Sequence, residues 1–117
     1  MNPLTFEIPI RTKSETNLRE HWAQHAKRKK EQRYKSNVFS LQWVDDLPPK
    51  PWRIVLTRLA PRRLDTGNLS ASMKHVQDGL CDAIGIDDGD EENDWLYKQR
   101  KRKEYGVEVT ISTKGNT

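Results

Sequence analysis

Residues 64–94 read LDTGNLSASMKHVQDGLCDAIGIDDGDEEND and lie between two stretches with strand-like patterns. Their first part has apolar residues at helical spacing, namely Leu69, Met73, Val76, Leu80 and Ile84. This spacing predicts one helix, from about Asn68 to Ala83, that buries its apolar stripe in the core. Asn68 is the expected N-cap and Gly85 the expected C-cap, because these residue types favour those helix ends.

Alternating apolar residues predict strands on both sides of that helix. WRIVLTRLA at residues 52–60 is apolar on both faces, which is typical of a central strand. Residues 95–101 and 105–112 alternate again, and we interpret residues 102–104 between them as a hairpin loop. The sequence therefore predicts one strand before the helix and a strand pair after it.

The N-terminal part predicts another strand, over residues 4–10, and a long helix, over residues 17–44. Asn17 is the expected N-cap of the long helix. That helix carries two apolar stripes, one of Leu18, Trp22 and Ala26 and one of Tyr34, Val38 and Leu41. The proline-rich residues 47–51 end the helix and form a stiff linker.

These elements predict one α+β domain over residues 1–117, in the order β-α-β-α-β-β. A small mixed sheet would pack against two helices, and residues 113–117 would form a frayed tail. With 33% hydrophobic residues and a mean hydropathy of -0.98, the chain can bury only a small core. Homodimerisation would add buried apolar area to such a chain.

The composition indicates an intracellular protein. Cys81 is the single cysteine of the sequence, which excludes an intramolecular disulfide and favours a reducing compartment. No apolar run approaches the roughly 20 residues of a membrane span, and the N-terminus lacks the pattern of a secretion signal. We therefore expect a soluble, cytoplasmic protein without a membrane partner.

Charge is distributed unevenly along the sequence. The chain has 21 basic and 17 acidic residues, but residues 78–94 hold eight carboxylates and no lysine or arginine. Without these carboxylates the net charge is +12. A basic surface around an acidic segment indicates a divalent cation beside a polyanion, and the pI of about 9.3 suits a nucleic acid. The alternative is a basic interaction module unrelated to DNA.

The acidic residues predict a metal site. Asp65 follows the central strand, and three further carboxylates follow the next helix: Asp87, Asp88 and Asp90. Oxygen ligands without a Cys or His cluster favour Mg²⁺, with Mn²⁺ as a substitute, and the glycine of DDGDEEND is misplaced for a calcium loop. Lys74 would stabilise charge on a phosphate. The alternatives are a solubilising, capping turn and a simple i,i+4 pair of Lys74 with Asp78.

Two basic groups are candidates for DNA contacts. One is the pair Arg62 and Arg63 in the loop before Asp65. The other is the run in the long helix, which consists of Lys27, Arg28, Lys29 and Lys30. Cations of this kind neutralise phosphates and give salt-sensitive binding. Residues 101–103 are a second choice, and the alternative for the helix is an ordinary solvated surface.

The segments RRLDTGNL, a later lysine, DGL and GIDD occur in an order that resembles the RusA family of Holliday-junction resolvases, which phages and prophages commonly carry. That family has a strand, a D-x-D-N-L motif, a helix with a lysine and a later Asp-Gly/Ala-Leu, and a loop that ends in two aspartates. The counterparts in this sequence are Asp65, Asn68, Leu69, Lys74, Asp78-Gly79-Leu80 and Asp87-Asp88.

The resemblance implies a Mg²⁺-dependent, homodimeric endonuclease of DNA recombination and repair. Such an enzyme binds four-way DNA junctions and nicks two strands of like polarity. The resemblance also implies that Asp65 and Asp88 bind the metal, with Asp87 beside them, and that Lys74 is the catalytic lysine.

Two positions depart from the family pattern. Gly67 stands where the family has the second carboxylate of D-x-D-N. Lys74 lies six residues after Asn68 instead of three, about one helical turn further along. Asp78 and Asp90 are candidate replacements for the missing carboxylate. The alternative function is a junction- or DNA-binding protein with an impaired catalytic site.

Overall fold

The computed structural model describes residues 3–13 and 22–115, which form a four-stranded mixed sheet and three α-helices. The strands are β1 (Leu4–Ile8), β2 (Trp52–Ala60), β3 (Asp94–Lys101) and β4 (Gly106–Thr113). Their order across the sheet is β1-β4-β2-β3. The pairs β1–β4 and β4–β2 are antiparallel, and β2 and β3 are parallel. The predicted α+β class and mixed sheet are confirmed, and β2 is the predicted central strand.

The predicted hairpin of the last two strands is wrong. Within the described residues, β4 pairs with β1 and β2, and β3 pairs with the other edge of β2. The connection passes the end of β2, where the Arg102 amide donates to the Ala60 carbonyl at 2.9 Å. The side chains explain why β4 lies inside the sheet and β3 at its edge. β4 buries Val107, Val109 and Ile111, which suits an inner strand. The outward residues of β3 include Lys98 and Arg100, and charged residues are typical of an exposed edge strand.

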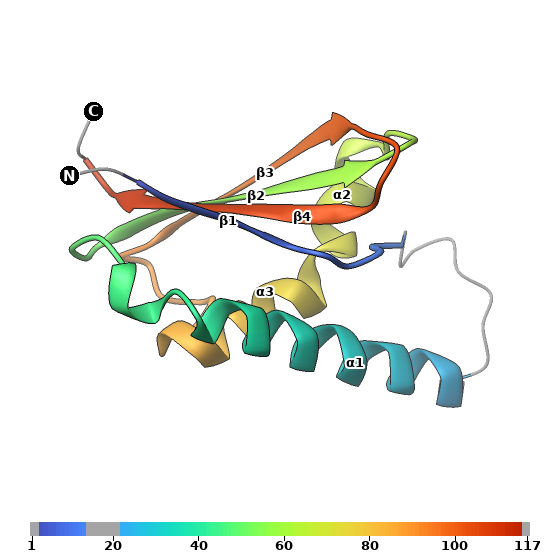
Figure 1. Cartoon of the computed structure of the whole chain (residues 1–117), viewed down its shortest axis with the longest axis horizontal. Helices are drawn as coiled ribbons and strands as arrows, with labels where there is room; N and C mark the ends of the chain where they lie inside the picture. The colour runs from blue at the N-terminus through green and yellow to red at the C-terminus, as the bar shows by residue number, and fades with distance from the viewer. Residues whose placement is uncertain (1–2, 14–21, 116–117) are drawn as a thin grey trace.

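The helices α1 (Trp22–Leu41), α2 (Thr66–Ser72) and α3 (Lys74–Ile84) cover one face of the sheet, and a short 3₁₀ turn, η1 (Val44–Asp46), follows α1 (Figure 1). The expected N-cap of α1, Asn17, lies outside the described residues. Within residues 3–13 and 22–115, no helix has the length and apolar character needed to cross a membrane.

The single helix predicted after β2 is two helices, so the predicted pair of helices becomes three in the described chain. α2 begins earlier than expected, because Asp65 and not Asn68 is its N-cap. The break lies at Met73, which has φ -96° and ψ -5°. The Ser72 hydroxyl donates to the Leu69 carbonyl at 2.7 Å, a local bond that competes with regular helix bonding. Gly85 ends α3 in the left-handed region, at φ 73°, as predicted.

The core lies between the helices and the inner face of the sheet. The predicted apolar stripe over α2 and α3 is buried there, and it packs with β-strand residues such as Ile8, Ile54, Leu56, Val109 and Ile111. Because β2, α2, α3 and the parallel β3 form one continuous crossover, this packing fixes where α3 begins and ends. The residues of the candidate site lie at those two ends.

α1 packs against α3 through a small, polar face. Gln32, Ser36 and Ser40 are its buried residues, and the Ser36 hydroxyl donates to the Val76 carbonyl at 2.6 Å. The helices approach closely at Gly79, where a β-carbon would lie 2.7 Å from the β-carbon of Ser36. The apolar stripe of α1 therefore faces solvent: Tyr34, Val38 and Leu41 are 71%, 38% and 49% exposed.

Candidate functional site

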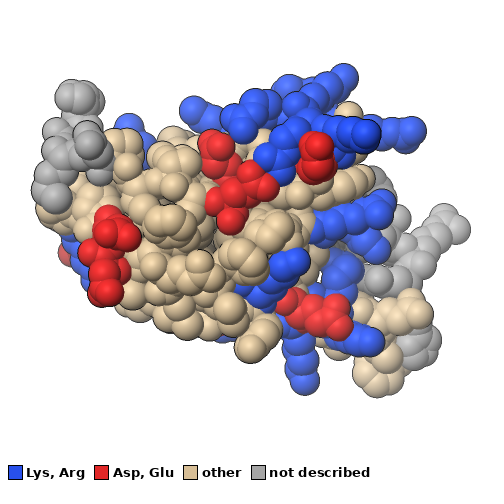
Figure 2. Space-filling view, in the orientation of Figure 1, with Lys and Arg blue, Asp and Glu red and all other residues tan. Residues whose placement is uncertain are grey.

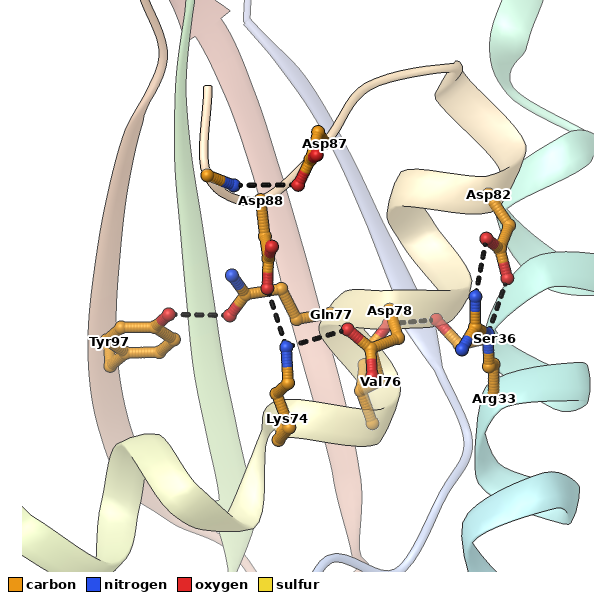
Figure 3. Close-up of polar contacts among 11 residues, drawn as sticks. Arg33, Ser36, Lys74, Val76, Gln77, Asp78, Asp82, Asp87, Asp88 and Tyr97 are labelled. Atoms are coloured by element: carbon orange, nitrogen blue, oxygen red, sulfur yellow. Dashed lines mark hydrogen bonds and ion pairs between the residues drawn. The ribbon is translucent and has the colours of Figure 1, made fainter. Parts of the chain in front are cut away.

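Lys74 links the two ends of α3. Its ammonium nitrogen lies 3.0 Å from Asp78 Oδ1, one turn along the helix, and 2.6 Å from Asp88 Oδ2, in the turn that follows the helix (Figure 3). The hydrogen bonds to Asp88 and Asp78 raise the pKa of Lys74. The hydrogen bond from Lys74 lowers the pKa of Asp88. The structure therefore brings two predicted catalytic residues, Lys74 and Asp88, into direct contact as a charged pair.

The acidic turn has an internal framework of its own. The left-handed Gly85 reverses the chain at the end of α3. The Gly89 amide donates to Asp87 Oδ1, and the Glu92 amide donates to Asp90 Oδ1, each at 3.0 Å. These bonds are the local turns that aspartates commonly stabilise. Asp87 and Asp90 thus stabilise the turn, as in the capping alternative, while Asp88 reaches back to α3.

An acidic hollow of about 500 Å³ lies beside this contact. Four carboxylates line it: Asp78, Asp82, Asp87 and Asp88. Arg33 of α1 closes one side by donating to both oxygens of Asp82, at 2.7 and 2.9 Å (Figure 3). The Arg33 hydrogen bonds lower the pKa of Asp82. Cys81 also lines the hollow, and burial raises its pKa to about 12, so its thiol stays protonated near neutral pH.

A second hollow, of about 460 Å³, shares Asp88 with the first and is also lined by Lys74. Its wall includes Tyr97, whose hydroxyl donates to Gln77 Oε1 at 2.5 Å. Burial raises the pKa of Tyr97. His75 is buried and also lines this hollow.

Asp65 has a clear local role at the start of α2. Its Oδ1 accepts the Asn68 amide at 3.0 Å, which satisfies one of the free N–H groups of the helix. In the described part of the chain, it lines neither hollow beside Asp88. Gly67, in the first turn of α2, has open space around it, because a β-carbon there would meet no atom within 4 Å. The structure therefore places Asp65 as a cap, separate from the acidic turn.

The donor set differs from the four predicted ligands. Among residues 3–13 and 22–115, no three His, Cys, Asp or Glu side chains form a group that could hold a metal. Asp78 and Asp88 do converge, but the Lys74 ammonium lies between them. Mg²⁺ commonly uses one or two protein carboxylates together with water and phosphate oxygens. The residues present therefore fit a two-carboxylate site around Asp88, and the role of Asp65 as a ligand stays a prediction.

The predicted DNA-contact residues lie on two elements. Lys27, Lys29 and Lys30 are exposed on α1. Arg62 and Arg63 are exposed in the loop after β2. Figure 2 shows that Lys and Arg side chains also gather around the end of β3 and the start of β4, where Lys101 and Lys103 are exposed. A polyanion would meet positive charge at each of these places.

Two side chains that sequence reasoning missed, the buried Arg58 and the half-buried Gln99, hold the loop of Arg62 and Arg63. The Arg58 guanidinium donates to Thr12 Oγ1 at 2.9 Å and to the Arg62 carbonyl at 2.6 Å, and burial lowers its pKa. The Gln99 side chain exchanges two hydrogen bonds with the backbone of Leu64, at 2.9 and 2.7 Å. The loop backbone between β2 and α2 is therefore fixed on both sides.

Sequence reasoning also missed the pairing of Arg33 with Asp82, because these residues are 49 positions apart.

Comparisons with models of known protein families and with curated proteins found no match. The proposal for this chain therefore depends on its own residues and their geometry.

Proposed function

We propose that this protein is a Mg²⁺-dependent, structure-selective endonuclease of the RusA type, which hydrolyses phosphodiesters at four-way DNA junctions. The observation that carries the proposal is the contact of Lys74 with Asp78 and Asp88. It joins a cation to one carboxylate of its own helix and to a second one fourteen residues further along, at the edge of an acidic hollow on an otherwise basic protein. Asp78 and Asp88 match the RusA-like sequence pattern, whereas Lys74 lies about one helical turn further along the chain than in that pattern.

The side chains support distinct roles in phosphodiester hydrolysis. Lys74 carries a positive charge that would stabilise the charge developing on a phosphate. Asp88, with Asp78 or Asp87, would hold Mg²⁺, or Mn²⁺ as a substitute. When bound, the metal would polarise the phosphate and lower the pKa of the attacking water. Lys74 would then move its hydrogen bonds from the two carboxylates to the phosphate.

The basic residues support the choice of DNA as the substrate. Arg62 and Arg63 project from a loop whose backbone is fixed by Arg58 and Gln99, so they meet a phosphate backbone with little loss of loop freedom. A symmetric pair of nicks requires two active sites, which a homodimer would supply.

A binding protein without nuclease activity is the second candidate. Gly67 provides no carboxylate, and the described residues contain no three-ligand group. Lys74 also forms ion pairs with the two carboxylates nearest to it, which leaves their pair with a single net negative charge. In this case the protein would bind branched DNA through its basic residues and leave the strands intact.

A cleavage assay on a synthetic four-way junction separates these functions. The nuclease proposal predicts symmetric nicks in Mg²⁺ that disappear in Asp88→Asn. The matched control is Glu91→Gln, which removes an exposed carboxylate of the same acidic segment that does not line the acidic hollow. Junction binding without nicks in Mg²⁺ or Mn²⁺ would establish the binding protein instead. Absence of junction binding at low salt would contradict both candidates and favour a module unrelated to DNA.

A further inference from the structure

We propose that α1 and the turn after it form a self-complementary surface through which two copies of this chain associate side by side in antiparallel orientation. The surface, here called the α1 stripe, consists of Lys30, Tyr34, Val38, Leu41 and Asp45. The proposal concerns the isolated protein and does not depend on DNA binding or cleavage.

The first observation is that α1 buries its polar side and exposes its apolar side. Tyr34, Val38 and Leu41 follow one another at spacings of four and three residues, so they lie on one face of the helix. That face is directed to solvent, because Ser36 and Ser40 occupy the side against α3. Apolar residues at this spacing on an exposed helix are typical of a helix-pairing surface.

The reason for this orientation lies in the packing at Gly79. A close approach of α3 to the backbone of α1 requires small side chains, and Ser36 provides one there. The Ser36 hydroxyl bond to the Val76 carbonyl and the Arg33 pair with Asp82 both hold α1 in this rotation. The apolar stripe therefore cannot turn into the core of its own chain without breaking these contacts.

The second observation is that opposite charges lie at the two ends of the stripe. Lys29 and Lys30 precede Tyr34, whereas Asp45 and Asp46 follow Leu41. These four residues are exposed, and within the described part of the chain none of them takes part in an ion pair. Their charges are therefore available to a partner.

The charge order selects both the occupant and its direction. In an antiparallel pair centred near Val38, Tyr34 lies opposite Leu41 of the second copy, and Lys30 lies opposite its Asp45. A parallel pair would place like charges together, which is unfavourable. The acidic end also disfavours DNA along the C-terminal half of this face, since phosphates would meet Asp45 and Asp46 there. A second copy would cover the apolar residues in the middle of the stripe and pair the charged residues at both of its ends.

Pairing through α1 would bring two candidate sites into one particle. α3, which carries Lys74, packs directly on α1 through Gly79. The two copies of Lys74 would then be related by the same two-fold axis that relates the helices.

The test is sedimentation equilibrium of the full chain without DNA, over a range of protein concentrations. We expect a reversible dimer of the 13.7 kDa chain. Val38→Glu should raise the dimer dissociation constant at least about tenfold, because it buries a charge in the apolar middle. Leu96→Glu is the matched control, since Leu96 is an exposed apolar residue on β3, 43% exposed, and should leave the constant unchanged.

A charge exchange tests the direction. Lys30→Asp and Asp45→Lys should each weaken the dimer, and the double variant should recover most of the loss. Circular dichroism and thermal melting would confirm that each variant is folded. A wild-type monomer at all concentrations, or a dimer that Val38→Glu leaves intact, would overturn the proposal. A double variant that is weaker than both single variants would overturn the antiparallel direction. A dimer without junction cleavage would leave this proposal standing and reject only the nuclease.

Discussion

The Lys74 ammonium lies 2.6 Å from Asp88 Oδ2, fourteen residues further along the chain. This contact joins the first turn of α3 to the turn that follows its last, so α3 and the acidic turn form one unit. The contact also keeps this ion pair at the surface, next to a hollow that three further carboxylates line. The state of this pair should therefore affect stability, metal affinity and any reaction at the site.

The Lys74–Asp88 pair predicts a pH-dependent loss of stability in acid. The lysine hydrogen bond lowers the pKa of Asp88 in the folded protein. The resulting stabilisation is present above the unfolded pKa, about 3.9, and is lost as pH falls through the lower folded pKa. Because both side chains are partly exposed, we expect about 0.2–1 kcal/mol.

Urea unfolding of wild type and Asp88→Asn would measure this effect at neutral pH and near pH 2. The difference in unfolding free energy should be present at neutral pH and shrink towards zero in acid. Glu91→Gln serves as the control for general acid effects. A difference between wild type and Asp88→Asn that is the same at both pH values would contradict the prediction.

Asp65 allows capping to be separated from metal binding. Asp65→Ala should lower the unfolding free energy by about 1 kcal/mol, because α2 loses its N-cap. Asp65→Asn should retain most of this stability, since an amide oxygen can accept the same Asn68 amide. If Asp65 is also a ligand, Asp65→Asn should abolish junction cleavage while unfolding stays close to wild type. Full cleavage by Asp65→Asn would restrict its role to capping.

Gly67→Asp tests whether the absent carboxylate limits activity. The position has room, because a β-carbon meets no atom within 4 Å, and a carboxylate in the first turn of a helix is favourable. We expect a folded protein with cleavage that appears or increases in Mg²⁺. Gly67→Asn is the matched control with similar size and no charge. Equal cleavage by both variants would show that the charge at this position has no role.

Gly79→Ala should destabilise the protein through a steric clash between α3 and α1. Its β-carbon would lie 2.7 Å from the β-carbon of Ser36 and also meet the Arg33 carbonyl, so backbone atoms must shift. Overpacking of this kind costs about 1–3 kcal/mol. Gly67→Ala, at an open helical position, should be neutral or slightly stabilising. Thermal melting of both variants would show the contrast, and an unchanged melting temperature in Gly79→Ala would contradict the close packing of α3 on α1.

Periodicity was sufficient to predict the elements that bury one continuous apolar set. The apolar stripe of α2 and α3 and the two-sided pattern of β2 identified the core and the central strand. Strand alternation does not encode the identity of the neighbouring strand, so it cannot show that β3 and β4 each pair with β2 and not with one another. The break at Met73 depends on the local bond of Ser72, and a run of helix-compatible residues does not reveal it.

The site was predictable only where its residues are close in sequence or belong to the RusA-like pattern. Lys74 and Asp78 are one turn apart, and Asp88 follows the same helix. The pairs Arg33–Asp82, Arg58–Thr12 and Gln99–Leu64 join segments that are distant in the chain. In the sequence these side chains look like ordinary surface or strand residues, so the pairing could not be predicted. The sequence also does not show which face of α1 is exposed. The close contact between Ser36 and Gly79 puts a polar face of α1 against α3, although the hydrophobic pattern would predict that the apolar stripe is buried.

Arg62 and Arg63 provide the test of the DNA surface. Each phosphate contact releases counterions, so the logarithm of the junction-binding constant should fall with the logarithm of salt concentration. Arg62→Gln together with Arg63→Gln should reduce the magnitude of that slope by about 1–2, because up to two phosphate contacts are lost. Arg58 and Gln99 hold the loop backbone and are unchanged, so the variant should remain folded. The control is Lys50→Gln, an exposed cation outside the predicted DNA-contact groups. An unchanged slope in the double variant would place the DNA elsewhere, with the α1 run and residues 101–103 as the next positions to neutralise.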